Sequence, residues 1–71
     1  KGIKLEFNLT RRELEVLQLF PEGLSIKEMA DRLYLTPATI KSHMYSIYQK
    51  LEVTNRVLAI AKAKDNNLLD S

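Results

Sequence analysis

The same helix-start signal occurs twice within the first thirty residues of this chain. Thr10-Arg11-Arg12-Glu13 and Ser25-Ile26-Lys27-Glu28 both fit the capping box, in which the hydroxyl accepts from the third helical amide and the carboxylate accepts from the amide of the cap. Thr36-Pro37 adds a third start, because proline at the first helical position sacrifices no hydrogen bond. Three helix starts this close together restrict a 71-residue chain to short helices packed against one another.

Stop signals and apolar spacing divide the chain into four helices. Pro21 disfavours helix in the residue before it and Gly23 tolerates a turn, so these two residues end the first helix. Thr54 and Asn55 are both good caps for the last one. Sustained period-two alternation is missing, although an edge strand over 3–7 stays open. We expect an all-α, four-helix domain with helices over about 11–20, 26–33, 37–51 and 56–66.

The segments 26–33 and 37–51 are joined by a very short link. Ala30 is small enough for one helix to cross the other closely, and Leu35 is expected to tuck into the turn. Two short helices joined in this way form a helix-turn-helix. The second helix turns one apolar stripe to the core, so its other side is free to enter the major groove of DNA as the recognition helix. The stripe consists of Ile40, Met44, Ile47, Tyr48 and Leu51.

The last helix has apolar residues on more than one side. We expect Val57, Ile60 and Ala61, followed by Leu68, to face the core. An ion pair between Glu13 and Arg56 is an alternative role for Glu13 and would hold this helix against the first. Apolar residues outside the stripe would be exposed and favour contact with a second copy of the domain. The expected dimer contacts are Leu58, Ala59, Lys62 and Ala63.

The segment 36–51 contains no acidic residue, although the whole chain has 11 Lys+Arg and 9 Asp+Glu. Hydroxyl, amide and ammonium groups without carboxylates suit a polyanion with readable base edges. The helix N-termini at Ser25 and Thr36 are expected to bind phosphates through backbone amides. Ser46 and Gln49 are expected to contact phosphates as well. The outward residues and their flanks are Ala38, Thr39, Lys41, Ser42, His43, Tyr45, Ser46, Gln49 and Lys50.

Composition excludes several other classes of function. With no Cys and one His, the chain cannot supply the ligand set of a structural zinc site, and we expect no metal or other cofactor. We expect no enzyme either, because Ser42 and Ser46 cannot both meet His43, the only candidate base, in a closed pocket. No apolar run approaches the ~18 to 20 residues that cross a bilayer and no leader opens the chain, so we expect no membrane contact and a cytoplasmic location.

Two other interpretations stay open at this point. A net charge of +2 and a pI of about 9.1 permit a nucleic-acid partner without requiring one, so a helical bundle that binds another protein is the first alternative. Salt-insensitive binding to a protein, with no response to duplex DNA, would favour it. The second is a promoter-recognition region of a sigma factor, which has a similar helix-turn-helix but usually a longer basic tail than 59–71 provides.

The chain resembles the LuxR/FixJ-type, or GerE-like, helix-turn-helix domains of bacterial transcription regulators. The resemblance covers about 9–68 and depends on many residues at fixed spacing. These residues are Leu9-Thr10-x-Arg12-Glu13-x-Glu15-Val16-Leu17, Gly23-x-Ser25-x-Lys27-Glu28-Met29-Ala30-x-x-Leu33, Thr39-Ile40-Lys41-x-His43 and Lys50-Leu51-x-Val53-x-x-Arg56-x-x-Ala59. We expect a linker or N-terminal extension over 1–8, the DNA-binding domain over 9–68 and a tail over 69–71.

The resemblance implies sequence-specific binding of double-stranded DNA by the C-terminal effector domain of a regulator, at the nucleoid. An upstream receiver or ligand-sensing domain and a homodimer formed through the last helix are implied with it. Lys41, Ser42 and Tyr45 match the positions that contact bases, and Tyr45, where many relatives carry a small or basic residue, is expected against a thymine methyl or a sugar. The positions implied to approach phosphates are Ser25, Lys27, Thr39, His43 and Lys50.

Overall fold

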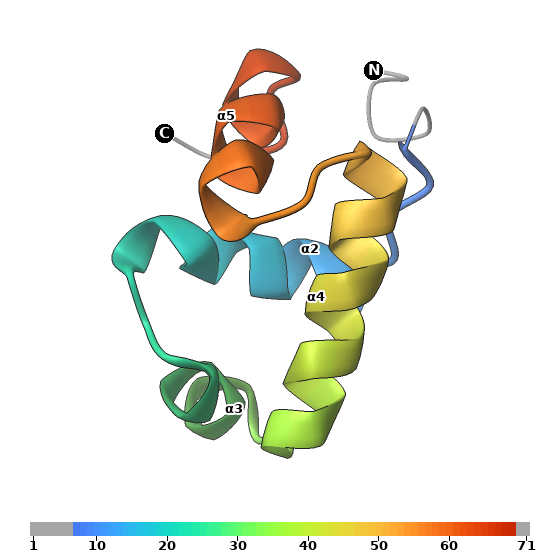
Figure 1. Cartoon of the computed structure of the whole chain (residues 1–71). Coiled ribbons are helices and arrows are strands. Elements are labelled where there is room, and N and C mark those ends of the chain that lie inside the picture. The colour runs from blue at the N-terminus through green and yellow to red at the C-terminus, as the bar shows by residue number, and fades with distance from the viewer. Residues whose placement is uncertain (1–6, 70–71) are drawn as a thin grey trace.

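The computed structural model describes residues 7–69, in which helices are joined by turns and short loops and no strand forms (Figure 1). The all-α, four-helix prediction is confirmed; of the possible strand over 3–7, residues 3–6 lie outside the described part. None of the helices in 7–69 combines the length and the apolar character needed to span a bilayer. The elements are α2 (Arg11–Leu19), the 3-10 turn η1 (Phe20–Glu22), α3 (Ile26–Leu33), α4 (Pro37–Leu51) and α5 (Arg56–Asp65).

Each of the four α-helices from α2 to α5 begins at a capping residue that the sequence identifies. Thr10 Oγ1 accepts from the amide of Glu13 at 3.1 Å, and Glu13 Oε1 accepts from the amide of Thr10 at 2.9 Å. The second capping box repeats this exchange between Ser25 and Glu28. Thr36 and Asn55 cap α4 and α5 through their side chains. Local hydrogen bonding therefore fixes all four helix starts.

The long helix α4 is the centre of the arrangement (Figure 1). It packs against α2, α3 and α5, with α3 at its N-terminal end and α5 toward its C-terminal end. Ile40, Ile47 and Leu51 on its inner side are fully buried, as the apolar stripe predicts. The opposite side of α4 is left without a covering element within residues 7–69.

The link between α3 and α4 is a tight turn of Tyr34, Leu35 and Thr36. Tyr34 adopts the left-handed conformation with φ of 60°, and the amide of Leu35 donates to the carbonyl of Ala30 at 2.9 Å. This hydrogen bond gives a partner to a carbonyl group in the last turn of α3, and Leu35 packs against the core. The predicted helix-turn-helix is therefore present, with α3 as its first helix and α4 as its second.

The prediction of which side of α5 faces the core is wrong. Ala59 and Ala63 are fully buried, whereas Val57 is 74% exposed. Small side chains let α5 approach α4 and η1 closely, and a larger residue facing inward would hold the helix away from them. Ile60 is partly buried and Leu68, just after the helix, is buried, whereas Ala61 is exposed, so only part of the predicted stripe is confirmed.

A glycine at position 52 is expected to stabilise the fold. Glu52 follows α4 with φ of 60°, a conformation that costs an ordinary residue about 1 to 2 kcal/mol, and its negative charge opposes the helix C-terminus. Since glycine also loses more entropy on folding, we expect Glu52→Gly to raise the free energy of unfolding by about 0.5 to 1 kcal/mol in urea titrations. Glu52→Gln removes the charge alone and is the control; a Gly variant less stable than the Gln variant would contradict the prediction.

Candidate nucleic-acid interface

The outer side of α4 exposes the three residues expected to contact bases. Lys41, Ser42 and Tyr45 are all exposed; Lys41 and Ser42 are neighbours in the chain, and Tyr45 lies one turn further along the helix. The ammonium group of Lys41 takes part in none of the ion pairs formed within residues 7–69. Gln49 continues the exposed surface one turn further on. The structure therefore brings these four side chains together on one solvent-facing surface.

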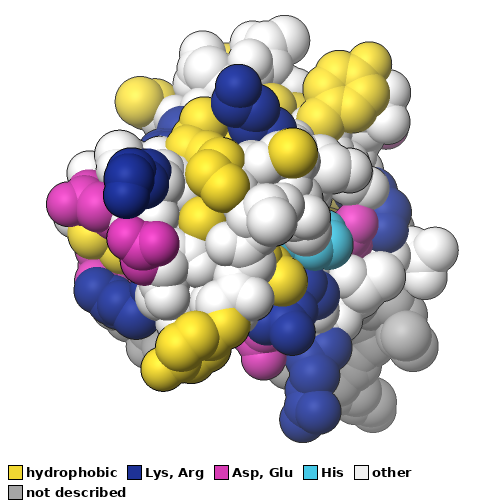
Figure 2. Space-filling view, turned by 90° about the horizontal axis from the view of Figure 1, so that it is seen from below, with side chains coloured by type: hydrophobic (Ala, Val, Ile, Leu, Met, Phe, Trp, Pro, Cys, Tyr) yellow, Lys and Arg dark blue, Asp and Glu magenta, His cyan; other side chains and the backbone are white. Residues whose placement is uncertain are grey.

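Positive charge on this surface is not opposed from within α4, since Pro37–Leu51 has no Asp or Glu. His43 and Ser46 flank the surface and are half-buried. Figure 2 looks at the α3 end of the molecule and shows Lys and Arg side chains spread over it, with hydrophobic side chains between them and Asp and Glu side chains gathered mainly toward one edge. Such a surface offers both phosphate attraction and apolar contact.

The start of α3 lies beside this surface and carries two of the predicted phosphate contacts. Ser25 is exposed, and its amide is already bonded to Glu28, which lowers the pKa of that carboxyl. The next two amides, of Ile26 and Lys27, belong to the first turn and have no intrahelical acceptor. Lys27 pairs with Asp31 at 4.0 Å with both side chains exposed, a contact too weak to hold its ammonium group away from another anion.

The first turn of α4 is stabilised by the hydroxyl groups of two threonines at its start. Thr36 Oγ1 accepts from the amide of Thr39 at 3.2 Å and lies 2.9 Å from Thr39 Oγ1. Thr36 is exposed and Thr39 is half-buried. Both hydroxyls therefore stabilise the first turn of α4 at the place where the sequence predicts phosphate contacts.

Lys50 is half-buried, and its ammonium group is bonded to groups of the protein itself. Its Nζ lies 2.8 Å from Glu13 Oε1 and donates to the carbonyl of Asn8 at 3.0 Å. Burial raises the pKa of Glu13, but hydrogen bonds from Lys50, the Thr10 amide and Ser46 outweigh burial and leave that pKa below its ordinary value. The role of Lys50 as a phosphate contact stays a prediction; its described partners tie α4 to α2 and to the residues before it.

The alternative ion pair between Glu13 and Arg56 is wrong. Glu13 is paired with Lys50, and Arg56 donates through Nη1 to the carbonyl of Leu24 at 2.6 Å. The guanidinium carbon of Arg56 also lies 5.1 Å from the centre of the Phe20 ring. Arg56 therefore holds α5 to η1 and the following loop through a carbonyl and an aromatic face rather than through a carboxylate.

A groove that the sequence does not predict lies beside α4. Met44 and Tyr48 belong to the stripe that the sequence predicts to face the core, but both are only half-buried and line an open groove of about 250 Å³ with Ile26, Lys41 and Tyr45. Both residues lie at the margin of the stripe, and this position is the only sign of the groove in the sequence. The distance from Met44 and Tyr48 to Ile26 depends on how α3 crosses α4, which the sequence does not specify.

Two of the four expected dimer contacts are not on the surface. Ala59 and Ala63 are fully buried against the core, so their assignment to an exposed side of α5 is wrong. Leu58 is 46% exposed and Lys62 is half-buried. Val57, which the sequence places inside, adds to the exposed apolar surface of α5.

The interface consists of hydroxyl, amide, ammonium and aromatic groups. His43, the single histidine of the chain, lies half-buried on α4. Across residues 7–69, three or more His, Cys, Asp or Glu side chains do not come together in a way that could hold a metal ion.

Comparison with known sequences identifies the relatives of this chain. The family model described as bacterial regulatory proteins, luxR family, matches residues 7–63. The transcriptional regulatory protein LiaR of Bacillus subtilis (strain 168) is 41% identical over 63 residues, which cover 89% of this chain and 30% of LiaR. The response regulator protein VraR of Staphylococcus aureus (strain NCTC 8325 / PS 47) is 41% identical over 69 residues, covering 97% of this chain and 33% of VraR. This chain therefore spans about a third of the length of these relatives.

Comparison with solved structures agrees with this result. The crystal structure of the response regulator ChrA of a heme-sensing two-component system superimposes with a TM-score of 0.82 at 43% sequence identity, over 84% of this chain and 30% of that one. The shared helix-turn-helix belongs to a class of transcription-factor domains that bind DNA and are not enzymes. The chain belongs to the luxR family of bacterial regulatory proteins and is a helix-turn-helix DNA-binding domain of that family.

Proposed function

We propose that this domain binds a specific double-stranded DNA sequence by inserting α4 into the major groove. The observation that carries the proposal is the division of α4 into two sides. Its inner side is anchored by fully buried residues, and its outer side exposes Lys41, Ser42 and Tyr45 without a carboxylate anywhere in the helix. A rigid helix that presents hydrogen-bond donors in this way fits the reading of base edges.

Phosphates on either side of the groove would position the domain. Ser25 and Lys27 at the start of α3 and Thr36 at the start of α4 lie next to amides of helix N-termini, where anions are stabilised. Contacts of this kind supply affinity and orientation but little sequence information. The other proposed phosphate contacts are Thr39, His43, Ser46, Gln49 and Lys50.

The regulator as a whole is proposed to be a response-regulator-like transcription factor of the bacterial cytoplasm that acts as a homodimer. Its relatives are about three times as long, which supports an upstream regulatory domain. One module gives a small interface with DNA, so two copies on half-sites about one helical turn apart would raise affinity. Exposed Leu58 and Val57, with Lys62, make α5 the proposed contact between copies.

An NMR titration with duplex DNA tests the location of the interface. A ¹⁵N-labelled domain would be titrated with a duplex of about 20 base pairs, two helical turns, at low and then moderate salt. We expect shifts concentrated in 25–27 and 36–50 that fade as salt rises, because phosphate contacts release counterions. Absence of shifts at low salt, for the single domain and for a tethered dimer, would contradict DNA binding and favour a protein-binding bundle.

Two lysine variants separate base reading from phosphate attraction. Lys41→Ala should lower the preference for a selected over a scrambled duplex about tenfold, since a side chain that reads a base edge contributes discrimination. Lys27→Ala should weaken binding to both duplexes equally and lower the salt slope by about one. Lys64→Ala removes the same charge from an exposed position on α5, outside the proposed DNA contacts, and is the control. Unchanged discrimination in Lys41→Ala would show that Lys41 is not a reader.

A further inference from the structure

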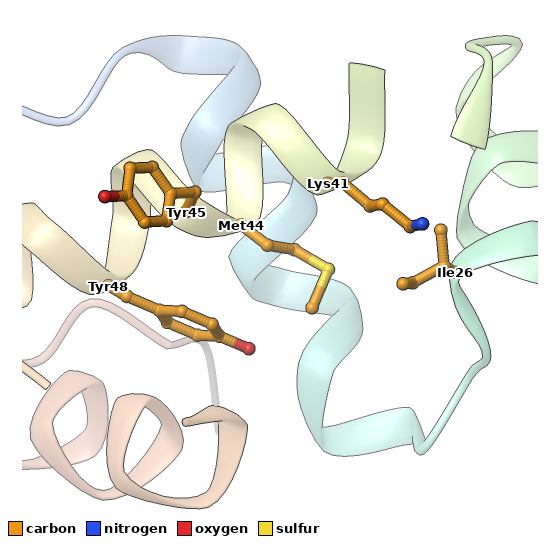
Figure 3. Close-up of a pocket in the computed structure, with 5 residues that line it drawn as sticks. All are labelled: Ile26, Lys41, Met44, Tyr45 and Tyr48. Atoms are coloured by element: carbon orange, nitrogen blue, oxygen red, sulfur yellow. The ribbon is translucent and has the colours of Figure 1, made fainter. Parts of the chain in front are cut away.

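The groove beside α4 has an unusual lining for a surface that meets DNA. Ile26 comes from the first turn of α3, and the other four residues come from successive turns of α4. Figure 3 shows the thioether of Met44 in the middle, the ring of Tyr48 on one side and the methyl groups of Ile26 on the other. The stem of Lys41 runs along the upper edge toward Ile26, so its charge lies at the rim. The floor of the groove is therefore apolar and its rim is cationic.

The groove is continuous with the proposed base-reading surface. Two of its lining residues, Lys41 and Tyr45, are also proposed base contacts, and both are exposed. Whatever Lys41 reaches in the major groove therefore lies next to the opening. The Tyr48 ring, which packs 6.2 Å from the ring of Phe20 in the core, gives the groove a fixed wall.

The apolar floor of the groove favours one chemical group of DNA as its occupant. The edges of the four standard bases display hydrogen-bond donors and acceptors in the major groove, and the only apolar group among them is the C5-methyl of thymine. Phosphates and the polar base edges would lose hydration against Met44 and Ile26 without gaining a partner. We propose that this groove receives a thymine methyl group and makes the domain require thymine beside the base that Lys41 contacts. The inference depends on the proposed function, because it names what the same surface reads.

Removal of single methyl groups from the DNA tests the inference directly. A high-affinity duplex is first selected from a random pool, and each thymine is then replaced singly with deoxyuridine, which keeps all hydrogen-bonding groups. We expect one position in each half-site at which deoxyuridine weakens binding about fourfold, the value of burying one methyl group. If neither the single domain nor a tethered dimer enriches any sequence, sequence-specific binding itself is overturned. If the selected duplex binds but deoxyuridine has no effect at any position, the groove inference alone is overturned.

A Met44 variant then assigns the effect to the groove. Met44→Ala opens the floor, so the ratio of affinities for thymine and deoxyuridine at the sensitive position should fall to about one. The ratio is measured within one protein, so a change in the folded fraction cancels, and a ¹⁵N correlation spectrum checks the fold. Tyr34→Ala is the matched control, because Tyr34 is exposed and lies outside the groove. A methyl effect that survives Met44→Ala unchanged would show that thymine is read elsewhere and would overturn the inference.

Discussion

Replacing Phe20 with Ala is expected to lower the free energy of unfolding by about 3 to 5 kcal/mol. Phe20 is 1% exposed and stands at the start of η1, where the first helix of the described fold gives way to the loop toward α3. Its ring contacts Tyr48 of α4 and carries the Arg56 guanidinium of α5 on its face. An alanine would leave a cavity and deprive both neighbours of a partner.

A loss of that size approaches the whole stability of a domain this short, which is about 4 to 10 kcal/mol. We therefore expect Phe20→Ala to be largely unfolded near physiological temperature, as followed by far-ultraviolet circular dichroism in urea. Tyr34→Ala removes a similar ring from a position that is 94% exposed and should shift the urea midpoint very little. If the two variants moved the midpoint equally, the core assignment of Phe20 would be wrong.

The second large effect is expected at Lys50. Lys50→Met keeps most of the side-chain stem but leaves Glu13, whose side chain is only 6% exposed, without its ammonium partner. Removing one member of a buried ion pair costs about 3 to 5 kcal/mol, and partial exposure of Lys50 reduces this to about 2 kcal/mol. Lys27→Met breaks the exposed pair with Asp31 and should cost close to nothing, which makes it the matched control.

Acid should diminish the effect of Lys50→Met. The folded protein holds the pKa of Glu13 below its ordinary value of 4.5, so the ionised carboxylate adds stability that is fully present above that value and is lost as pH falls through the lowered pKa. In Lys50→Met, burial acts on Glu13 without the hydrogen bond from Lys50, so the pKa rises and the carboxyl is protonated more readily.

The two proteins therefore differ most in stability at neutral pH and converge as Glu13 becomes protonated. Urea unfolding of both proteins across a pH series measures the difference. A difference that stayed constant from neutral pH to below 4.5 would show that Lys50 acts through the packing of its stem rather than through Glu13.

Helix starts were predictable from the sequence because capping is a local interaction. Thr10 and Ser25 each find their carboxylate three residues away, so nothing beyond one helical turn decides the outcome. The buried side of α4 was predictable for a related reason, since Ile40, Ile47 and Leu51 repeat with the helical period. The outer side then followed by exclusion.

The inner side of α5 and the partner of Glu13 were not predictable in this way. Apolar residues, large and small, occur on more than one side of α5. Because α5 packs closely against α4 and η1, the small Ala59 is buried there and the larger Val57 is not. Glu13 and Lys50 are 37 positions apart in the sequence. Only the packing of α2 against α4 decides that Lys50, and not Arg56, becomes the partner of Glu13. The groove depends in the same way on how α3 crosses α4. Each of these features is decided by packing between helices.

The two-sided use of α4 has a consequence for how regulators of this kind diverge. Lys41, Ser42 and Tyr45 are exposed and support no part of the core, so substitutions there leave the scaffold nearly as stable as before. Under the proposed function, a duplicated copy of such a domain would therefore acquire a new target sequence through few changes, without a compensating mutation elsewhere. Met44 and Tyr48 differ from these three residues, because they pack against the core and also line the groove. Under the proposed reading of thymine, a change at either residue would alter folding and recognition together.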